Sequence, residues 1–236
     1  MFEISKPPVI GFYTLPKLRS RMADPTRNVP LRTVSAKQRS SFTELLAFGL
    51  TREALDAIME MVTVMNVVEN FIQGSLENAD LLALSSMRDH ARHRLWSLPT
   101  GEVLLGASGQ FSLYECFRLG ALMFAVSLFF PMPRSTGMPQ ELMQRIKQWI
   151  EQTDIALLSS LGVGRFFIWL LTLTGIAADC LPERQWFEEK LTDLLMLEGV
   201  STWMEVESIA ESFIWVQSAC EEGAVKLWEK VAANLS

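Results

Sequence analysis

This 236-residue chain has little of several residue types that define common protein classes. Its three cysteines stand at positions 116, 180 and 220, and neither their odd number nor their wide separation is typical of a disulfide framework. We expect all three to be reduced, buried small hydrophobes of an intracellular protein, nuclear or cytoplasmic. No secretory signal peptide is evident, because the first thirty residues lack an apolar core.

Long hydrophobic runs are also missing. The two longest, Leu119–Pro131 and Phe166–Ala178, have about thirteen residues each, whereas a membrane-spanning helix needs about twenty. We therefore expect no membrane span and interpret both runs as helices of a protein core.

Tyrosine is scarce, with two residues, and β-branched residues seldom alternate with polar ones. Hydrophobic residues nevertheless make up 49% of the chain and include seven Trp, fourteen Phe and twelve Met. This composition excludes a disordered chain and favours an all-α fold. We predict a single domain of about eight or nine helices around a central apolar helix.

Charge divides the chain into two parts. The net charge is −6, but residues 1–40 carry +6, which leaves −12 for the rest. We predict a basic, proline-containing and partly extended N-terminal arm over residues 1–36 and a helical domain over 37–236. The arm is either a solvated tail or a nuclear-import or nucleic-acid tail, whereas an acidic body is a poor partner for phosphate backbones.

The central helix is predicted over Phe166–Ala178, because this run is apolar on nearly every face and must be surrounded by other elements. The Leu181-Pro182 pair then breaks the helix, and an amphipathic helix opens at Glu183 and ends at Gly199. The remaining helices are predicted from periodicity, capping residues and breakers at Ser41–Gly49, Thr51–Gly74, Ala79–Leu98, Ser112–Pro131 (capping box Ser112-x-x-Glu115), Gln140–Ser160, Thr202–Trp215 (capping box Thr202-x-x-Glu205) and Glu221–Leu235.

Neither a metal site nor a catalytic group is indicated. The only histidines, His90 and His93, could share a helix face, but arginines surround them and no cysteine lies nearby. The cysteines have no neighbouring base, and Gly162-Val163-Gly164 is too short for a phosphate loop. We expect no metal and no cofactor, and we assign no catalytic residue.

Two groups of residues are candidates for a functional or architectural role. Charged residues beside dense apolar sequence are usually paired, so we expect ion pairs that tie helices together; these residues are Glu115, Arg118, Glu183 and Arg184. Aromatic residues of the C-terminal half form either a filled core or the wall of a pocket for an apolar small molecule; these residues are Phe166, Phe167, Trp169, Trp186, Phe187, Trp203, Phe213 and Trp215.

The order of several short segments resembles a known family. The segments are Ile168–Leu171, Thr174–Ala178 and Glu183–Phe187, preceded by His93-Arg94-Leu95 before Leu98-Pro99, then Tyr114–Ala121, and followed by the Trp203 region. Together they look like the C-terminal regulatory domain of fungal zinc-cluster transcription factors, over roughly Leu50 to Lys230. None of these segments is chemically specific, and the resemblance depends on their order and spacing.

The resemblance implies a helical regulatory domain of a transcription regulator, which binds an apolar metabolite or contacts other transcription proteins. The family's zinc cluster needs six closely spaced cysteines, so we expect no direct DNA binding through such a module. Two alternatives stay open. One is a stand-alone helical pocket that acts as an enzyme or carrier in secondary metabolism, such as a cyclase or isomerase; the other is a scaffold that forms homodimers.

Overall fold

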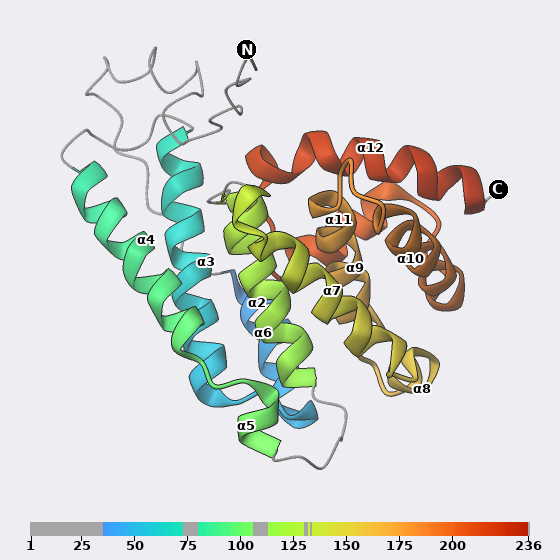
Figure 1. Cartoon of the computed structure of the whole chain (residues 1–236), viewed down its shortest axis with the longest axis horizontal. Coiled ribbons are helices and arrows are strands. Elements are labelled where there is room, and N and C mark those ends of the chain that lie inside the picture. The colour runs from blue at the N-terminus through green and yellow to red at the C-terminus, as the bar shows by residue number, and fades with distance from the viewer. Residues whose placement is uncertain (1–34, 73–79, 106–112, 130–131, 133, 236) are drawn as a thin grey trace, which may run out of the picture.

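The structure, a computed structural model, describes residues 35–72, 80–105, 113–129, 132 and 134–235. Every regular element within these ranges is helical, so the prediction of an all-α domain is confirmed (Figure 1). The elements are α2 (Ala36–Glu44), η1 (Leu45–Phe48), α3 (Arg52–Ile72), α4 (Asp80–Ser97), α5 (Gly101–Leu105), α6 (Leu113–Met123), the π-helical turn η3 (Phe124–Phe129), η4 (Arg134–Thr136), α7 (Met138–Glu151), α8 (Ile155–Ser160), α9 (Gly164–Ala177), α10 (Arg184–Glu198), α11 (Trp203–Glu211) and α12 (Gln217–Leu235). Among the described helices, none combines the length and apolar character that crossing a bilayer requires.

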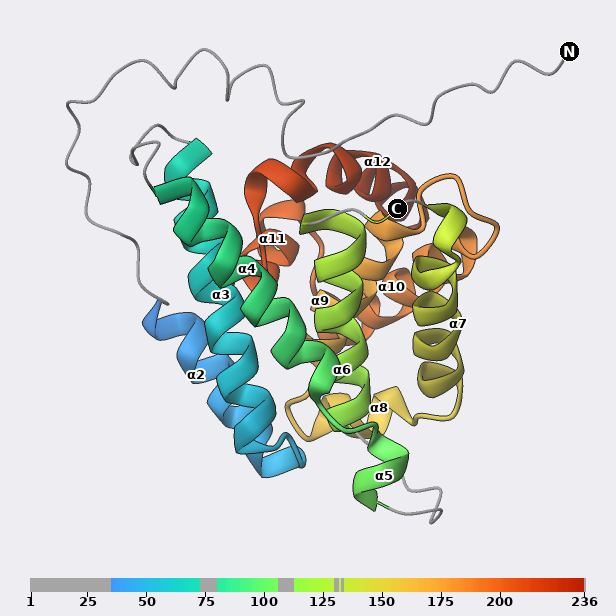
Figure 2. The same ribbon diagram turned by 60° about the vertical axis from the view of Figure 1, so that its left-hand side comes forward.

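Helix α9 is the predicted central helix. All of its residues are buried except Arg165 and Ala177, because α6, α8, α10, α11 and α12 all pack against it. Figures 1 and 2 show α9 inside the C-terminal part of the molecule, with α12 across one end and α6 beside it. A helix that is hydrophobic all round is stable in water only when neighbours cover it in this way.

The corner between α9 and α10 follows the predicted Leu-Pro break. Helix α10 runs over Arg184–Glu198 and is capped by Gly199, which has a left-handed φ of 67° that glycine adopts without strain. Cys180 lies in the corner with a φ of 63° and is exposed. The expectation that all three cysteines are buried is therefore wrong for Cys180, because the corner turns its side chain out of the core.

Helix α2 connects the start of the described chain to its C-terminal part. Its first turn is closed by a capping box between Ser35 and Gln38. The Gln38 side-chain amide also donates a 3.1 Å hydrogen bond to the Phe213 carbonyl oxygen, and Phe42 packs edge-on against Phe213. Residues 1–34 of the predicted arm lie outside the described residues, so the predicted boundary between arm and helical domain stays a prediction.

Helices α6 and α9 approach closely at Gly120. A methyl group at this position would lie 2.7 Å from Leu170 Cδ1 and 3.2 Å from the Trp169 ring. The absence of a side chain at Gly120 therefore sets how near α6 comes to the central helix.

Several helix predictions are wrong in their bounds. The first helix begins at Ala36 rather than Ser41, and the last begins at Gln217 rather than Glu221. The stretch Gln140–Ser160 is two helices, α7 and α8, because Asp154 caps a new helix by accepting a 3.0 Å hydrogen bond from the Leu157 amide. The helix that opens at the Thr202 capping box ends at Glu211, so Phe213 and Trp215 lie in the loop before α12. Their side chains are buried, so the apolar pattern indicated burial rather than helix.

Candidate functional site

The eight aromatic residues predicted to form either a filled core or the wall of a pocket lie in three groups of ring contacts. The first group contains Phe166, Phe167, Trp169 and Phe213, and Phe42 and Phe117 join it from α2 and α6. Neighbouring ring centroids in this group are 5.2 to 6.1 Å apart, and every ring is at most 4% exposed. Rings at these separations are in van der Waals contact, so this group is packed core.

The second group lies between α11 and α12. The Trp203 ring is 6.1 Å from the Trp215 ring and 6.0 Å from the Trp228 ring. Trp215 also donates a 3.0 Å hydrogen bond to the side-chain oxygen of Gln217 at the start of α12. These tryptophans fasten the C-terminal helices to each other.

The third group is Trp186 with Phe187, whose rings meet edge to face at 4.9 Å. Phe187 is fully buried, whereas Trp186 is half-buried. Lys147 on α7 places its ammonium group 5.1 Å from the centroid of the Trp186 ring, at cation–π distance. Of the eight predicted aromatic residues, Trp186 lines a surface groove that is described below.

Glu115 and Arg118 form a buried ion pair, with side chains 2% and 5% exposed. Arg118 donates bonds of 2.8 and 2.6 Å to the two carboxylate oxygens, and the Gly101 amide at the start of α5 donates a 2.8 Å bond to the same carboxylate. The Arg145 guanidinium group on α7 lies 3.8 Å from the Glu115 carboxylate. The carboxylate thus links three helices, whereas Arg118 bonds within its own helix. Ser112, the cap residue predicted for Glu115, lies outside the described residues.

Arg184 connects the two ends of the α9–α10 corner. Its guanidinium group donates a 2.9 Å hydrogen bond to the Asp179 carboxylate after α9 and a 2.7 Å hydrogen bond to the Glu188 carboxylate on α10. Asp179 also lies 3.6 Å from Lys226 of α12. Glu183 supplies its backbone carbonyl, which accepts the Phe187 amide at the start of α10. These contacts hold the corner together.

The surroundings of His90 and of the buried cysteines indicate neither a metal site nor a reactive thiol within the described ranges. His90 Nε2 lies 3.4 Å from Glu60 Oε1, and within the described ranges no three His, Cys, Asp or Glu side chains form a group that could hold a metal ion. Burial raises the pKa of the Cys116 thiol, and it raises that of Cys220 to about 12. Both thiols are therefore protonated at neutral pH.

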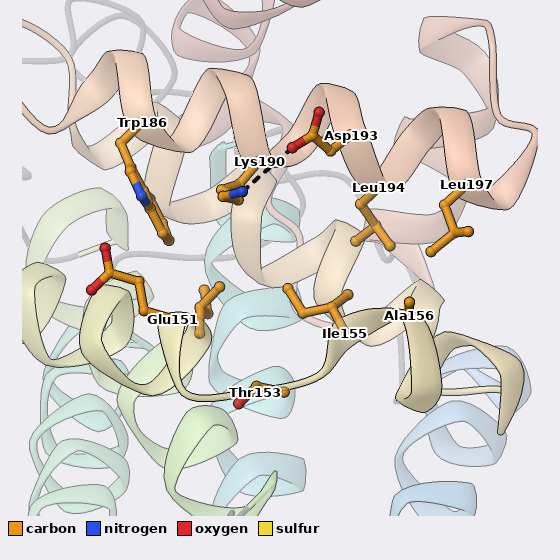
Figure 3. A pocket seen from close by; sticks show the side chains of 10 residues that line it. Glu151, Thr153, Ile155, Ala156, Trp186, Lys190, Asp193, Leu194 and Leu197 are labelled. Carbon is orange, nitrogen blue, oxygen red and sulfur yellow. Dashed lines mark hydrogen bonds and ion pairs between the residues drawn. The ribbon is translucent and has the colours of Figure 1, made fainter.

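A groove of about 380 Å³ lies where the chain turns from α7 into α8, with α10 as its opposite wall (Figure 3). Trp186, Leu194 and Leu197 project from α10 toward the α7–α8 turn, and Ile155 projects back from the turn. The complete lining is Ile150, Glu151, Thr153, Ile155, Ala156, Trp186, Lys190, Asp193, Leu194 and Leu197. Most of this wall is apolar.

The turn that creates this groove has a local cause. After Glu151 the chain leaves the helix, and the Thr153 hydroxyl donates a 2.6 Å bond back to the Trp149 carbonyl. Asp154 then caps α8. None of the six residues of α8 is fully buried. The signal that could have revealed the turn is an Asp just before an apolar run, since Asp is a favoured helix N-cap.

Each charged side chain that lines this groove has an ion-pair partner, and Lys147, the partner of Glu151, lies outside the lining. Lys190 lies 3.4 Å from Asp193, and Glu151 lies 3.8 Å from Lys147. All four side chains remain partly exposed, so each pair is weak, and each pair as a whole carries no net charge.

The fold and the groove together define an all-helical domain with a mainly apolar groove on its surface. No protein-family model matches the chain, and neither a curated protein nor a solved structure matches it.

Proposed function

We propose that this chain is a regulatory domain that binds a ligand in the α7–α8–α10 groove and passes the binding event to a partner protein. This is the role that the resemblance to zinc-cluster regulators implies, and it is a role of binding rather than of bond breaking. The ligand site in this proposal is the groove, with Trp186 as the residue it shares with the predicted aromatic pocket.

The observation that carries the proposal is the position of α10 between the groove and the core. One face of α10 carries Trp186 and Leu197 to the groove, and the buried Leu194 lines the groove from the edge of the core face. The core face carries Phe187 and Leu195, which are fully buried, and α10 packs directly along α9. A ligand that contacts α10 therefore adds stabilising contacts to a helix that belongs to the core.

A reporter experiment tests the regulatory role. The full chain is fused to an unrelated DNA-binding module, and transcription of a reporter is measured in cells. We expect the fusion to change transcription relative to the DNA-binding module alone. We also expect Ala156→Trp, which places an indole in the groove, to alter that response.

The matched control is Ala47→Trp, because Ala47 is also exposed but lies outside the groove lining. The control fusion should behave like the unchanged chain. A fusion that leaves transcription at the level of the DNA-binding module alone would rule out the regulatory role.

A further inference from the structure

We infer that the α7–α8–α10 groove accepts a small, uncharged molecule that has a flat ring system and a single hydroxyl or carbonyl group. This inference rests on the proposed function, because it names the chemical class of the ligand for the same site. Size, charge, ring geometry and polar groups each support it.

Size favours a small molecule. Sites for small ligands have volumes of about 300 to 1,000 Å³, and the groove, at about 380 Å³, lies near the lower limit. A two-ring compound fits such a volume. The groove is also bounded on two opposite sides, by α10 and by the α7–α8 turn, which encloses a compact ligand better than an extended one (Figure 3).

Charge favours an uncharged ligand. The Lys190 ammonium already faces the Asp193 carboxylate, and Glu151 already faces Lys147. A ligand with a net charge would have to compete with one of these pairs and would be repelled by the other member. An uncharged ligand leaves both pairs in place.

The Trp186 ring favours a flat ligand. The plane of its indole is nearly perpendicular to that of the buried Phe187 ring, at 88°, and the Lys147 ammonium lies 5.1 Å from the centroid of the indole, so the orientation of the indole is set before a ligand arrives. Flat rings pack on a fixed indole at little cost in conformational entropy. Ile155 and Leu194 supply apolar surface across the groove.

Polar groups at one edge of the groove favour a single hydroxyl or carbonyl. Lys190 has three N–H donors, and its pairing with Asp193 leaves the other donors able to bind a ligand oxygen. Asp193 can in turn accept a bond from a ligand hydroxyl. One oxygen-containing group at the edge of a ring system would satisfy this pair without breaking it.

Three naphthalene probes that share one ring system and differ in charge test the inference. These are 2-naphthol, which is neutral, 2-naphthoate, which is an anion, and 2-naphthylmethylammonium, which is a cation. Binding to the full chain is measured by calorimetry at neutral pH. We expect 2-naphthol to bind about fivefold more tightly than either ion, which corresponds to about 1 kcal/mol for disturbing an exposed ion pair.

Two variants locate the binding and test the charge argument. Ala156→Trp should abolish 2-naphthol binding, whereas Ala47→Trp should leave it unchanged. Asp193→Asn removes the partner of Lys190, so 2-naphthoate should gain affinity relative to 2-naphthol. Asp193 is exposed, and the folding of this variant is checked by thermal unfolding.

Tighter binding of either ion than of 2-naphthol, or no binding of any probe up to millimolar concentration, would overturn the inference about ligand class. Equal binding to the unchanged chain and to Ala156→Trp would overturn the location. The reporter experiment does not use these probes, so a failure of the ligand class is distinguishable from a failure of the regulatory role.

Discussion

The indole Nε1 of Trp169 donates a 2.8 Å hydrogen bond to the backbone carbonyl oxygen of Ile214, and both groups are buried. Trp169 lies on the central helix α9, and Ile214 lies in the loop between α11 and α12. Phe213 of the same loop packs 5.6 Å from the Trp169 ring. The central helix thus fixes the path of a loop that follows 45 residues later in the chain.

Replacement of Trp169 should show how much the packing and the hydrogen bond of its indole contribute to the free energy of unfolding. We expect Trp169→Ala to lower the free energy of unfolding by about 3 to 5 kcal/mol, since it removes a large buried ring. Trp169→Phe should cost about 1 to 3 kcal/mol, because it leaves the Ile214 carbonyl without its donor. Urea denaturation measures both. Trp96→Ala is the control, since Trp96 is 38% exposed, and a similar loss there would contradict the central role of Trp169.

Gly120→Ala should destabilise the protein although alanine favours helix. The new methyl group would lie 2.7 Å from Leu170 Cδ1, and such overpacking costs about 1 to 3 kcal/mol. The gain in helix propensity is at most about 1 kcal/mol. A double-mutant cycle with Leu170→Ala should give a favourable coupling energy, because Leu170→Ala removes the clashing carbon. Additive losses would show that the two helices do not meet at this point.

The Glu115 carboxylate should be needed for the packing of α5, α6 and α7. Glu115→Ala leaves the Arg118 guanidinium group buried without its carboxylate, and we expect a loss of about 3 to 5 kcal/mol in unfolding free energy. The double variant Glu115→Leu/Arg118→Met should lose less than Glu115→Ala, because it removes both charges. The measurement is chemical denaturation, with Arg92→Ala in an exposed pair as control. A larger loss in the double variant would show that the charges themselves stabilise the fold.

Glu205 should make stability depend on pH in the acid range. Hydrogen bonds from the Ser201 amide and from the hydroxyl and amide of Thr202 lower the pKa of the Glu205 carboxyl in the folded chain. A lowered folded pKa means that the stabilisation is complete above the unfolded value, about 4.3. It is then lost as the pH falls through the folded pKa.

The test compares the melting temperature of the unchanged chain with that of Glu205→Gln between neutral and acid pH. We expect the difference between the two proteins to shrink as the pH falls below the unfolded value. Glu207→Gln is the control, because Glu207 lies on the same helix but the capping box is formed by Thr202 and Glu205. A difference that is constant with pH would contradict the capping role of the ionised carboxylate.

The sequence predicted the fold class and the central helix because these depend on local patterns. An apolar run such as Phe166–Ala178 has to be buried on all faces, and the capping box at Thr202 has to start a helix. The regulatory role, the binding partner and the ligand stay predictions that rest on resemblance and on the proposed groove.

The groove was not predictable in the same way. Lys190 and Asp193 have the pattern of a solvent-facing helix surface, and only the turn at Thr153–Asp154 brings a second wall opposite them. The helical period continues on both sides of this turn, so the pattern predicted one helix. The cap at the start of α12 was also not predictable from local sequence. Glu69 of α3 accepts hydrogen bonds from the amide and hydroxyl of Ser218, which follows it by 149 residues.

The sequence by itself therefore determined that this protein is a helical domain with α9 at its centre, because burial of apolar residues and helix capping act over a few residues. The tertiary structure alone decided which side chains meet: that Glu115 joins three helices, that eight aromatic residues separate into three groups, and that a groove opens between α10 and the α7–α8 turn. The physical reason is that contacts between distant segments depend on the angles at a few turns, and those angles are fixed only when all the helices pack together.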